Sequence, residues 1–270
     1  MWLRSKLEHL PLGGIRYFEK IPSTMDEAAA WLKDDAPDMA LVIANEQTQG
    51  RGRLNRTWYT PANAALAFSL ILRPKPHEPI SSWMLYSGLA AVSICEVLEG
   101  HFQLLPQIKW PNDILLNHKK TAGILLESQW QGNELMGMII GVGINVAPSS
   151  IPPLSAVLFP ATCMEECLAE SYLAGVQSID RYQTLAWILE HILVWREQIS
   201  SPPFIQSWEA RLAYRNQWVQ IFQEPSNQTN PIPVFEGILM GLNDDGSLRI
   251  QNSQSKIQDI RSGEIRLRVK

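Results

Sequence analysis

The sequence predicts an α+β fold, in which a mixed, largely antiparallel sheet is flanked by helices and followed by a small C-terminal β-barrel. Between residues 107 and 146, strand-like segments follow one another with only short turns between them. Beyond residue 215 the helical patterns stop, and short strands alternate with turn signals such as Asn243-Asp244-Asp245-Gly246. We therefore expect two units, residues 1–215 and residues 216–270.

A helix near the N-terminus is marked by its first residues. Thr24 and Glu27 have the Ser/Thr-x-x-Glu spacing of a capping box, and an alanine-rich run continues the helix. The hydroxyls of Ser23 and Thr24 are typical of such a cap, but at a helix N-terminus they also suit a polar ligand. The other elements expected before residue 100 are strands over 15–19, 40–44 and 64–72 and a helix over 83–98.

The rest of the chain continues this mixture of strands and helices. Strands are expected over 107–110, 114–116, 121–130 and 136–146, and residues 147–162 are rich in proline and serine. Helices are expected over 163–199, with a break near 175–180, and over 204–214. The strands of the barrel are expected over 218–222, 234–240, 247–251, 257–260 and 265–269.

The composition limits the classes of function. The net charge of −4 and the pI of about 5.8 argue against a general affinity for nucleic acid. No run approaches the ~20 apolar residues of a membrane span, and the first residues lack the features of a signal peptide. Three cysteines, an odd number, indicate a reducing compartment, the cytoplasm. Cys163 and Cys167 lack a second pair or a nearby histidine, so we expect buried helix cysteines rather than a metal site.

An arginine-rich loop follows the strand over 40–44. Gly50 and Gly52 can take positive φ and let the backbone approach a ligand closely. Arg51 and Arg53 offer permanent positive charge that suits phosphate or carboxylate, and Trp58 closes the stretch. The alternative is a solvated surface loop that happens to be basic, because short glycine motifs also match by chance.

Two further segments carry candidate ligand contacts. In Lys109-Trp110-Pro111-Asn112-Asp113, a lysine on a strand precedes a turn that proline fixes, although such a lysine also reaches solvent beside a core tryptophan. In Gly141-Val142-Gly143-Ile144-Asn145, alternate glycines leave room for a ligand or another backbone, with the Asn145 amide on the same face. A bulge or a tight sheet crossing explains these glycines equally well.

The chemistry that the sequence lacks narrows the reaction class. It contains no Gly-x-Ser-x-Gly elbow and no cysteine in an obvious nucleophile context. It also contains no His-x-x-x-His pair, which argues against a zinc hydrolase. Arginine, lysine, glycine and amide groups with few nucleophiles suit charge stabilisation and positioning. Phosphoryl and adenylyl transfer have these requirements.

Together these segments resemble the biotin–protein ligase family over nearly the whole chain. The motifs stand in the family's order: Ser23-Thr24-Met25, Gly50-Arg51-Gly52-Arg53, Lys109 to Asp113, Lys120-Thr121-Ala122-Gly123 and Gly141 to Asn145. The resemblance implies the class II synthetase-like fold of biotin and lipoate ligases with an SH3-like C-terminal barrel. It also implies that biotin and MgATP form biotinyl-5′-adenylate. The biotinyl group then passes to one lysine of a biotin carboxyl carrier protein, usually an acetyl-CoA carboxylase subunit.

The resemblance implies roles for individual residues. Lys109 matches the catalytic lysine that bridges the biotin carboxylate and the α-phosphate, and Arg51 belongs to the loop that closes over the adenylate. The biotin-binding residues implied are Ser23, Thr24, Met25, Gln47, Gly50, Arg51, Gly52, Arg53, Lys109 and Gly123. Those implied for ATP and the adenylate are Arg51, Arg53, Trp58, Lys109, Asn112 and Asn145, and no residue is assigned to a metal.

The sequence departs from the family pattern in three places. Met25 stands where many relatives carry asparagine, and Leu54-Asn55 replaces an Arg-Gly pair, which removes a cation and a flexible point from the loop. Only 22 residues precede Ser23, too few for a three-helix DNA-binding domain, so we expect a ligase without repressor function.

Two other functions remain as alternatives. A lipoate–protein ligase or octanoyl transferase shares the fold, although the glycine–arginine and Lys-Trp-Pro-Asn-Asp motifs favour biotin. A nucleic-acid-binding module would use the arginine loop and the barrel, but the acidic pI counts against it. We expect neither a nucleic-acid nor a membrane partner, and a homodimer formed by edge-to-edge sheet pairing is compatible with the sequence.

Overall fold

The computed structural model describes residues 2–74, 83–153, 159–170, 178–222 and 232–267. Its first seven strands are β1 (Gly14–Ile21), β2 (Ala40–Gln47), β3 (Ala65–Leu72), β4 (Gln107–Lys109), β5 (Asp113–Leu116), β6 (Lys119–Gln131) and β7 (Glu134–Asn145). The others are β8 (Trp218–Phe222), β9 (Phe235–Leu242), β10 (Leu248–Gln251), β11 (Ile257–Ile260) and β12 (Glu264–Leu267). The α-helices are α1 (Trp2–Leu7), α2 (Thr24–Lys33), α3 (Trp83–Phe102), α4 (Met164–Glu170), α5 (Arg181–Arg196) and α6 (Pro202–Ala210).

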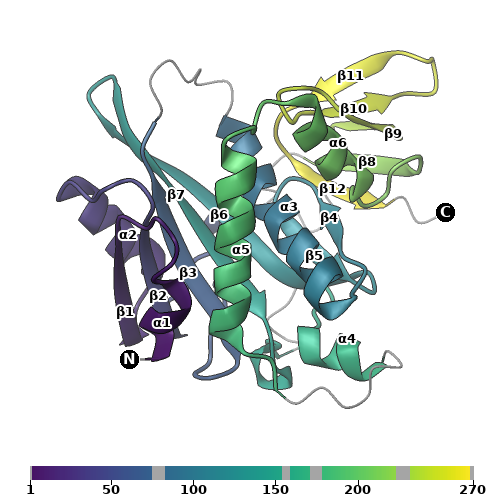
Figure 1. The fold of residues 1–270 in the computed structure, drawn as a ribbon. Coiled ribbons are helices and arrows are strands. Elements are labelled where there is room, and N and C mark those ends of the chain that lie inside the picture. The colour runs from purple at the N-terminus through teal and green to yellow at the C-terminus, as the bar shows by residue number, and fades with distance from the viewer. Residues whose placement is uncertain (1, 75–82, 154–158, 171–177, 223–231, 268–270) are drawn as a thin grey trace.

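These strands form two sheets. The larger has the order β1-β2-β3-β7-β6-β5-β4, in which β1 and β2 are parallel and the other neighbours are antiparallel. The smaller is antiparallel with the order β11-β10-β9-β8-β12, and it lies at the upper right of Figure 1. The predicted α+β fold, with a mixed and largely antiparallel sheet and a small C-terminal all-β part, is confirmed.

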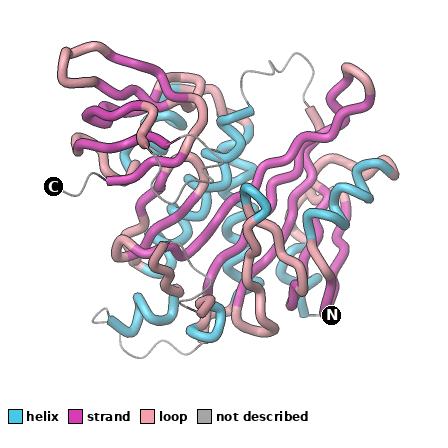
Figure 2. The backbone as a smooth tube through the Cα atoms, turned by 180° about the vertical axis from the view of Figure 1, so that it is seen from behind, coloured by secondary structure: helices cyan, strands magenta, loops and turns pink. Residues whose placement is uncertain are grey.

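The two faces of the larger sheet carry different helices. Successive side chains of β2 point to opposite faces, so Leu41 and Ile43 join the main core while Ala40 and Val42 join a second cluster. The helices α3 and α5 cover the main-core face in Figure 1. The second cluster lies under α2, and seen from behind this face also carries loops (Figure 2).

Two local expectations were wrong. No helix was expected before residue 14, but α1 forms there and buries Leu7 to 1% exposure. The capping box at Thr24 and Glu27 does not form, because Ser23 is the N-cap and makes no side-chain cap bond. Glu27 instead accepts a hydrogen bond of 2.7 Å from Arg16 on β1. The expected break between helices near 175–180 agrees with residues 178–180, which are not helical, while residues 175–177 lie outside the described residues.

The connection between α6 and β8 is attached to the larger sheet. The Ile108 amide of β4 donates to the Arg211 carbonyl at 2.7 Å, and the Ala213 amide donates to the Ile108 carbonyl at 2.9 Å. These bonds give β4, at the edge of the larger sheet, a second backbone neighbour. The proposed division into residues 1–215 and 216–270 falls within this connection and stays a prediction.

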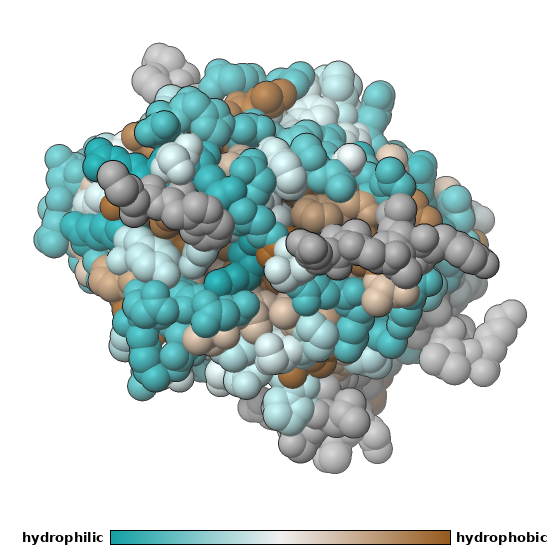
Figure 3. Space-filling model, turned by 60° about the horizontal axis from the view of Figure 1, so that its bottom comes forward, coloured by the Kyte–Doolittle hydropathy of each residue, from teal (hydrophilic) through white to brown (hydrophobic). Residues whose placement is uncertain are grey.

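The surface and the helices fit a folded chain with a polar exterior. Viewed from below, polar side chains cover most of the visible face, and apolar ones form small separate patches (Figure 3). Among the described residues, none of the helices combines the length and the hydrophobicity that crossing a membrane requires.

Candidate active site

A cavity of about 910 Å³ opens on the α2 side of the larger sheet. Its walls are the loop from Gly50 to Trp58, here called the arginine loop, and the turn from Lys109 to Asp113, here called the lysine turn. The cavity brings together these predicted site residues: Thr24, Met25, Gln47, Arg51, Gly52, Arg53, Trp58, Lys109, Asn112, Gly123 and Asn145. Ser23 and Gly50 lie outside its lining.

Small residues on adjacent strands form the floor of the cavity. Gly123 of β6 pairs with Gly143 of β7, which pairs in turn with Ala67 of β3. A Cβ atom at Gly143 would lie 2.1 Å from Nε1 of Trp58, so the indole fills the space that this glycine leaves. Met25 fills the space above Gly141 in the same way, with its sulfur 2.5 Å from where a Cβ would stand. The alternate glycines therefore admit side chains in this structure, rather than marking a bulge.

A chain of polar side chains occupies one end of the cavity. Ser69 donates to the Thr24 hydroxyl at 2.8 Å, and Gln47 Oε1 accepts from the Thr24 amide at 2.8 Å and from its hydroxyl at 3.1 Å. Gln47 Nε2 donates to the Thr60 hydroxyl at 3.0 Å. The Ser23 hydroxyl is buried without a partner among the described residues. This end offers both donors and acceptors, as a urea-like group requires.

The lysine turn places one ammonium group deep in the other end. Lys109 ends β4 and is 6% exposed, and its Nζ lies 4.4 Å from the centroid of the Phe159 ring. Asn112 fixes the turn on β6, because its side chain donates to the Ile124 carbonyl and its carbonyl accepts from the Ile124 amide, both at 2.9 Å. The lysine is thus held on a rigid strand end, in contact with an aromatic face.

A second ammonium group lines the same cavity, and the sequence reading gave it no role. Lys120 Nζ forms an ion pair with Asp113 Oδ1 at 2.6 Å and lies 5.4 Å from the centroid of the Trp58 ring. The seven-residue spacing across the β5–β6 hairpin brings these charges together. That spacing was the signal in the sequence that could have identified the pair.

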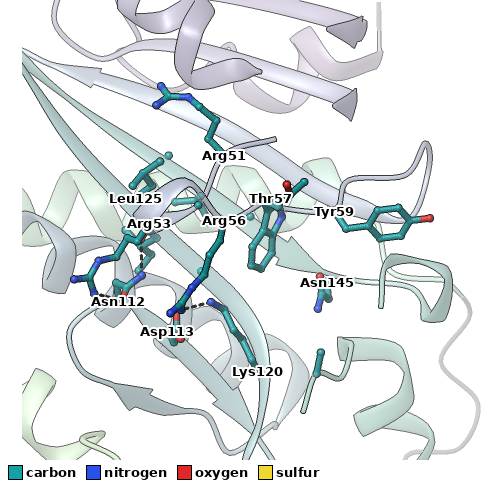
Figure 4. A pocket seen from close by; sticks show the side chains of 18 of the residues that line it. Arg51, Arg53, Arg56, Thr57, Tyr59, Asn112, Asp113, Lys120, Leu125 and Asn145 are labelled. Atoms are coloured by element: carbon teal, nitrogen blue, oxygen red, sulfur yellow. Dashed lines mark hydrogen bonds and ion pairs between the residues drawn. The ribbon is translucent and has the colours of Figure 1, made fainter. Parts of the chain in front are cut away.

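The three arginines of the arginine loop point in different directions. Arg51 turns away from the cavity in Figure 4, and its guanidinium donates to both oxygens of Glu127 at 2.7 and 3.0 Å. Its Nε also pairs with Asp26 at 2.9 Å. Arg53 donates to the Asn112 side chain at 2.9 Å, and Figure 4 shows Arg56 reaching toward the cavity. Sequence reading had not selected Arg56.

The glycines of this loop do not take positive φ, which corrects the expectation for Gly50 and Gly52. Positive φ falls instead on Leu54 (58°) and Asn55 (59°), within a short 3₁₀ turn over Arg53–Asn55. Gly50 is needed for close approach, since a Cβ there would lie 2.4 Å from the Trp58 carbonyl. The bend therefore lies at the pair of residues where this chain departs from the family pattern.

Hydrogen bonds and charges also constrain the remaining site groups. The hydrogen bonds to Glu127 raise the pKa of the Arg51 guanidinium, so its charge is retained. Burial raises the pKa of the Tyr214 hydroxyl, and the negative charge of Asp113 adds to the effect. The Asn145 amide donates to the Thr162 carbonyl at 3.0 Å, and Trp58 Nε1 is buried without a partner among the described residues. One cavity thus joins a polar end to an end with two lysines and two arginines, an arrangement that can hold a polar acid beside a phosphate.

Comparisons with known proteins agree with this arrangement. Residues 17–145 match the Biotin/lipoate A/B protein ligase family. The bifunctional ligase/repressor BirA of Bacillus subtilis (strain 168) is 32% identical over 252 residues, which cover 93% of this chain and 73% of BirA. The biotin–[acetyl-CoA-carboxylase] ligase of Paracoccus denitrificans is 33% identical over 215 residues, 77% of this chain and 82% of that protein. A solved biotin protein ligase from Aquifex aeolicus, in complex with biotin and ATP, aligns with a TM-score of 0.73 and 27% identity over 95% of this chain and 99% of that chain.

Proposed function

This chain belongs to the biotin/lipoate A/B protein ligase family, and we propose that it activates biotin with ATP and transfers the biotinyl group to a carrier protein. It is an enzyme, a biotin–[biotin carboxyl-carrier protein] ligase that forms AMP. The observation that carries this proposal is the single cavity in which the Thr24–Gln47 polar chain and the ammonium groups of Lys109 and Lys120 face one space. A vitamin with a polar ring and an acidic tail matches the two ends of that space.

The polar end is our proposed site for the biotin ring. Thr24 and Gln47 present hydroxyl and amide groups to the cavity, and the Ser23 hydroxyl, which is buried beside Thr24 but outside the lining, has no partner among the described residues. The ureido group of biotin has both donors and an acceptor, so this end can satisfy it. Met25 and the glycine floor then line the path of the apolar tail.

The basic end is our proposed site for the first chemical step. A carboxylate oxygen of biotin attacks the α-phosphorus of ATP, the bond to the β-phosphate oxygen breaks, and pyrophosphate leaves. Both reactants are anions, so fixed cations must offset their repulsion and stabilise the charge that develops. We assign this role to Lys109, and the position of Lys120 in the same cavity makes it a second candidate for the bridging cation.

The second step needs no nucleophile from this chain. The carrier lysine amine attacks the acyl carbon of the adenylate, AMP leaves, and an amide bond forms. Before that attack the adenylate must be kept from water, because it is a mixed anhydride. We assign this protection to the arginine loop, with Arg51 and Arg53 as its charged residues and Trp58 packed over the floor beside Asn145.

Magnesium enters this reaction bound to ATP. Among the described residues, no three His, Cys, Asp or Glu side chains group to hold a metal ion, and the cavity carboxylate of Asp113 pairs with Lys120. Such a donor set fits Mg²⁺ that is held mainly by phosphate oxygens and water. The residues of the cavity would therefore bind MgATP as one substrate.

Further properties of the protein are also proposals. The three cysteines are free thiols, which supports the cytoplasm as the compartment. The net charge of −4 supports the absence of a nucleic-acid partner. Within the described residues β1 has a strand neighbour on one side only, an edge that supports pairing with a second copy in a homodimer.

The test of the proposed function is a mass measurement. The protein is mixed with MgATP, biotin and a biotin carrier domain, and the carrier is analysed by intact-mass and peptide mass spectrometry. We expect the mass of one biotinyl group on a single lysine, which is lost when ATP is omitted. Transfer of lipoate in place of biotin would support the related lipoate–protein ligase activity, and no transfer of either acid would contradict the proposal.

A further inference from the structure

The smaller sheet, β8 to β12, is called the C-terminal sheet below, and one of its turns makes a buried hydrogen bond to the lysine turn. Nε1 of Trp110 donates to the Gly246 carbonyl at 3.0 Å, across 136 residues of sequence. Trp110 is 2% exposed, so water cannot replace this partner readily. The two neighbours of Trp110 in the turn are Lys109 and Pro111, and all three line the cavity. The bond therefore links the C-terminal sheet to the strand end that carries an ammonium group.

The acceptor lies in a tight turn that is itself held in place. Gly246 takes a φ of +79° between β9 and β10, and its amide donates to the Asn243 carbonyl at 2.9 Å. A Cβ at Gly246 would lie 2.9 Å from the Trp208 ring and 3.3 Å from Leu85. Glycine is required here both by the positive φ and by this packing. The carbonyl that receives the Trp110 hydrogen bond is thus fixed on the side of α6 and α3.

At the same junction, the Glu209 carboxylate attaches the C-terminal sheet to α6. Glu209 of α6 accepts from the Leu242 amide at the end of β9 at 2.8 Å, and it pairs with Arg215 at 2.6 Å. Neither Glu209 nor its partners line the cavity. Ile265 of β12 does line it, so the C-terminal sheet touches the cavity both directly and through Trp110.

Two other parts of the lysine turn are held by α3 and by β6 of the larger sheet. Ser87 of α3 donates to the Pro111 carbonyl at 2.8 Å, and Asn112 is fastened to Ile124 of β6. These bonds fix the turn after the proline. The Trp110 bond fixes it before the proline, next to Lys109, where a small displacement moves the ammonium group directly.

We propose that Trp110 is a positioning residue through which the C-terminal sheet sets the place of Lys109 in the cavity. The inference rests on the proposed ligase function. It assigns the C-terminal sheet a part in the adenylation step, apart from any contact with the carrier. We expect the affinity for biotin to stay unchanged, because Thr24 lies on α2 and Gln47 lies on β2, away from this junction.

The test compares two tryptophan variants of the full-length protein. Trp110→Phe keeps a ring but removes the hydrogen bond to Gly246. Trp208→Phe trims the packing on the same turn, and it removes an Nε1 that has no partner among the described residues. We expect Trp110→Phe to lower kcat for biotin-dependent ATP–pyrophosphate exchange about tenfold, with the biotin Kd changed less than about twofold. Trp208→Phe should keep kcat within about threefold of the unaltered protein.

A third variant separates positioning from folding. Glu209→Ala loosens the C-terminal sheet without touching the cavity, and it should lower kcat severalfold while the biotin Kd stays constant. Equal kcat values for Trp110→Phe and Trp208→Phe would overturn the inference, and so would an unchanged kcat in Glu209→Ala should Trp110→Phe fail to fold. Absence of exchange in the unaltered protein would instead count against the proposed function itself.

Discussion

The lysine turn and the arginine loop face the same cavity, but they are held in place by different kinds of contact. The lysine turn is fastened by a buried hydrogen bond to Gly246 and by a partly buried one to Ile124. The arginine loop has two short backbone bonds, and its outer side is tied by Arg51 to Glu127 and Asp26, with the Arg51 side chain 38% exposed. Both segments are basic in sequence. The structure separates a preorganised cation from a cation whose place depends on solvent-exposed ion pairs.

The largest effect is expected when an ammonium group is removed from the cavity. Lys109→Met and Lys120→Met each remove one ammonium group but keep an apolar stem in the cavity. We expect adenylate formation to fall by about a hundredfold or more in each, because fixed charge at a developing anion is worth that much. Biotin-dependent ATP–pyrophosphate exchange measures the loss.

The matched control for these variants is Lys33→Met, which removes an exposed ammonium group at the end of α2. Its exchange rate should equal that of the unaltered protein. The relative loss in the two cavity variants identifies the principal bridging cation. Near-normal exchange in both variants would contradict the role of a preorganised cation, because neither ammonium group would then contribute to adenylate formation.

A smaller effect is expected where the arginine loop meets the lysine turn. Arg53→Ala removes the 2.9 Å hydrogen bond to Asn112 together with one cation. We expect the KM for ATP to rise about tenfold, as for the loss of one charged hydrogen bond, with a lesser fall in kcat. Steady-state kinetics at varied ATP would measure both constants. An unchanged KM would show that the loop and the turn act independently.

A still smaller effect is expected on the outer side of the loop. Glu127→Gln removes the charge that pairs with Arg51 but keeps the shape of the side chain. We expect the bound adenylate to leave about two to five times faster, as an exposed ion pair contributes little. The rate can be followed by stopped-flow release of the adenylate. Glu134→Gln, at the exposed start of β7, is the control and should release the adenylate at the rate of the unaltered protein.

The smallest effect is expected from salt, which should loosen the arginine loop more than the lysine turn. Screening at 1 M salt has a range of about 3 Å, so it weakens exposed ion pairs more than buried bonds. Trypsin cuts after arginine, and we expect cleavage after Arg51, Arg53 or Arg56 to quicken as the salt concentration rises. Cleavage after Lys109 should stay slow, because this residue is 6% exposed. Mass spectrometry of the fragments separates the sites, and equal acceleration at both would contradict the contrast.

Much of the fold followed from the sequence because it depends on local patterns. The apolar run at β2 and the glycine-bearing β7 were predicted as strands, and each has a strand neighbour on both sides in the larger sheet. The short helix α1 was missed, since few residues carry its pattern and it is stabilised by packing rather than by propensity. The capping box failed because Ser23, and not Thr24, is the N-cap, and because Glu27 accepts instead from Arg16 on β1, which is close in the fold but 11 residues away in sequence.

The site divides in the same way. Many residues that line the cavity stand in short motifs, so Lys109, Asn112, Arg51 and Arg53 could be predicted from the sequence, whereas Arg56 was missed. What each side chain contacts was not predictable, because the partners are long-range. The ion pair of Asp113 with Lys120 and the bond from Trp110 to Gly246 depend on how strands and sheets meet. The spacing of residues in the sequence indicates which residues belong to a site, whereas tertiary packing determines how their side chains are arranged.

The most direct test is a crystal structure of the protein with a non-hydrolysable biotinyl-adenylate analogue. We predict that the biotin ring lies against Thr24 and Gln47 and that the phosphoryl group lies within hydrogen-bond distance of the ammonium of Lys109 or of Lys120. An analogue bound with its phosphoryl group away from both ammonium groups, or in a place other than this cavity, would contradict it.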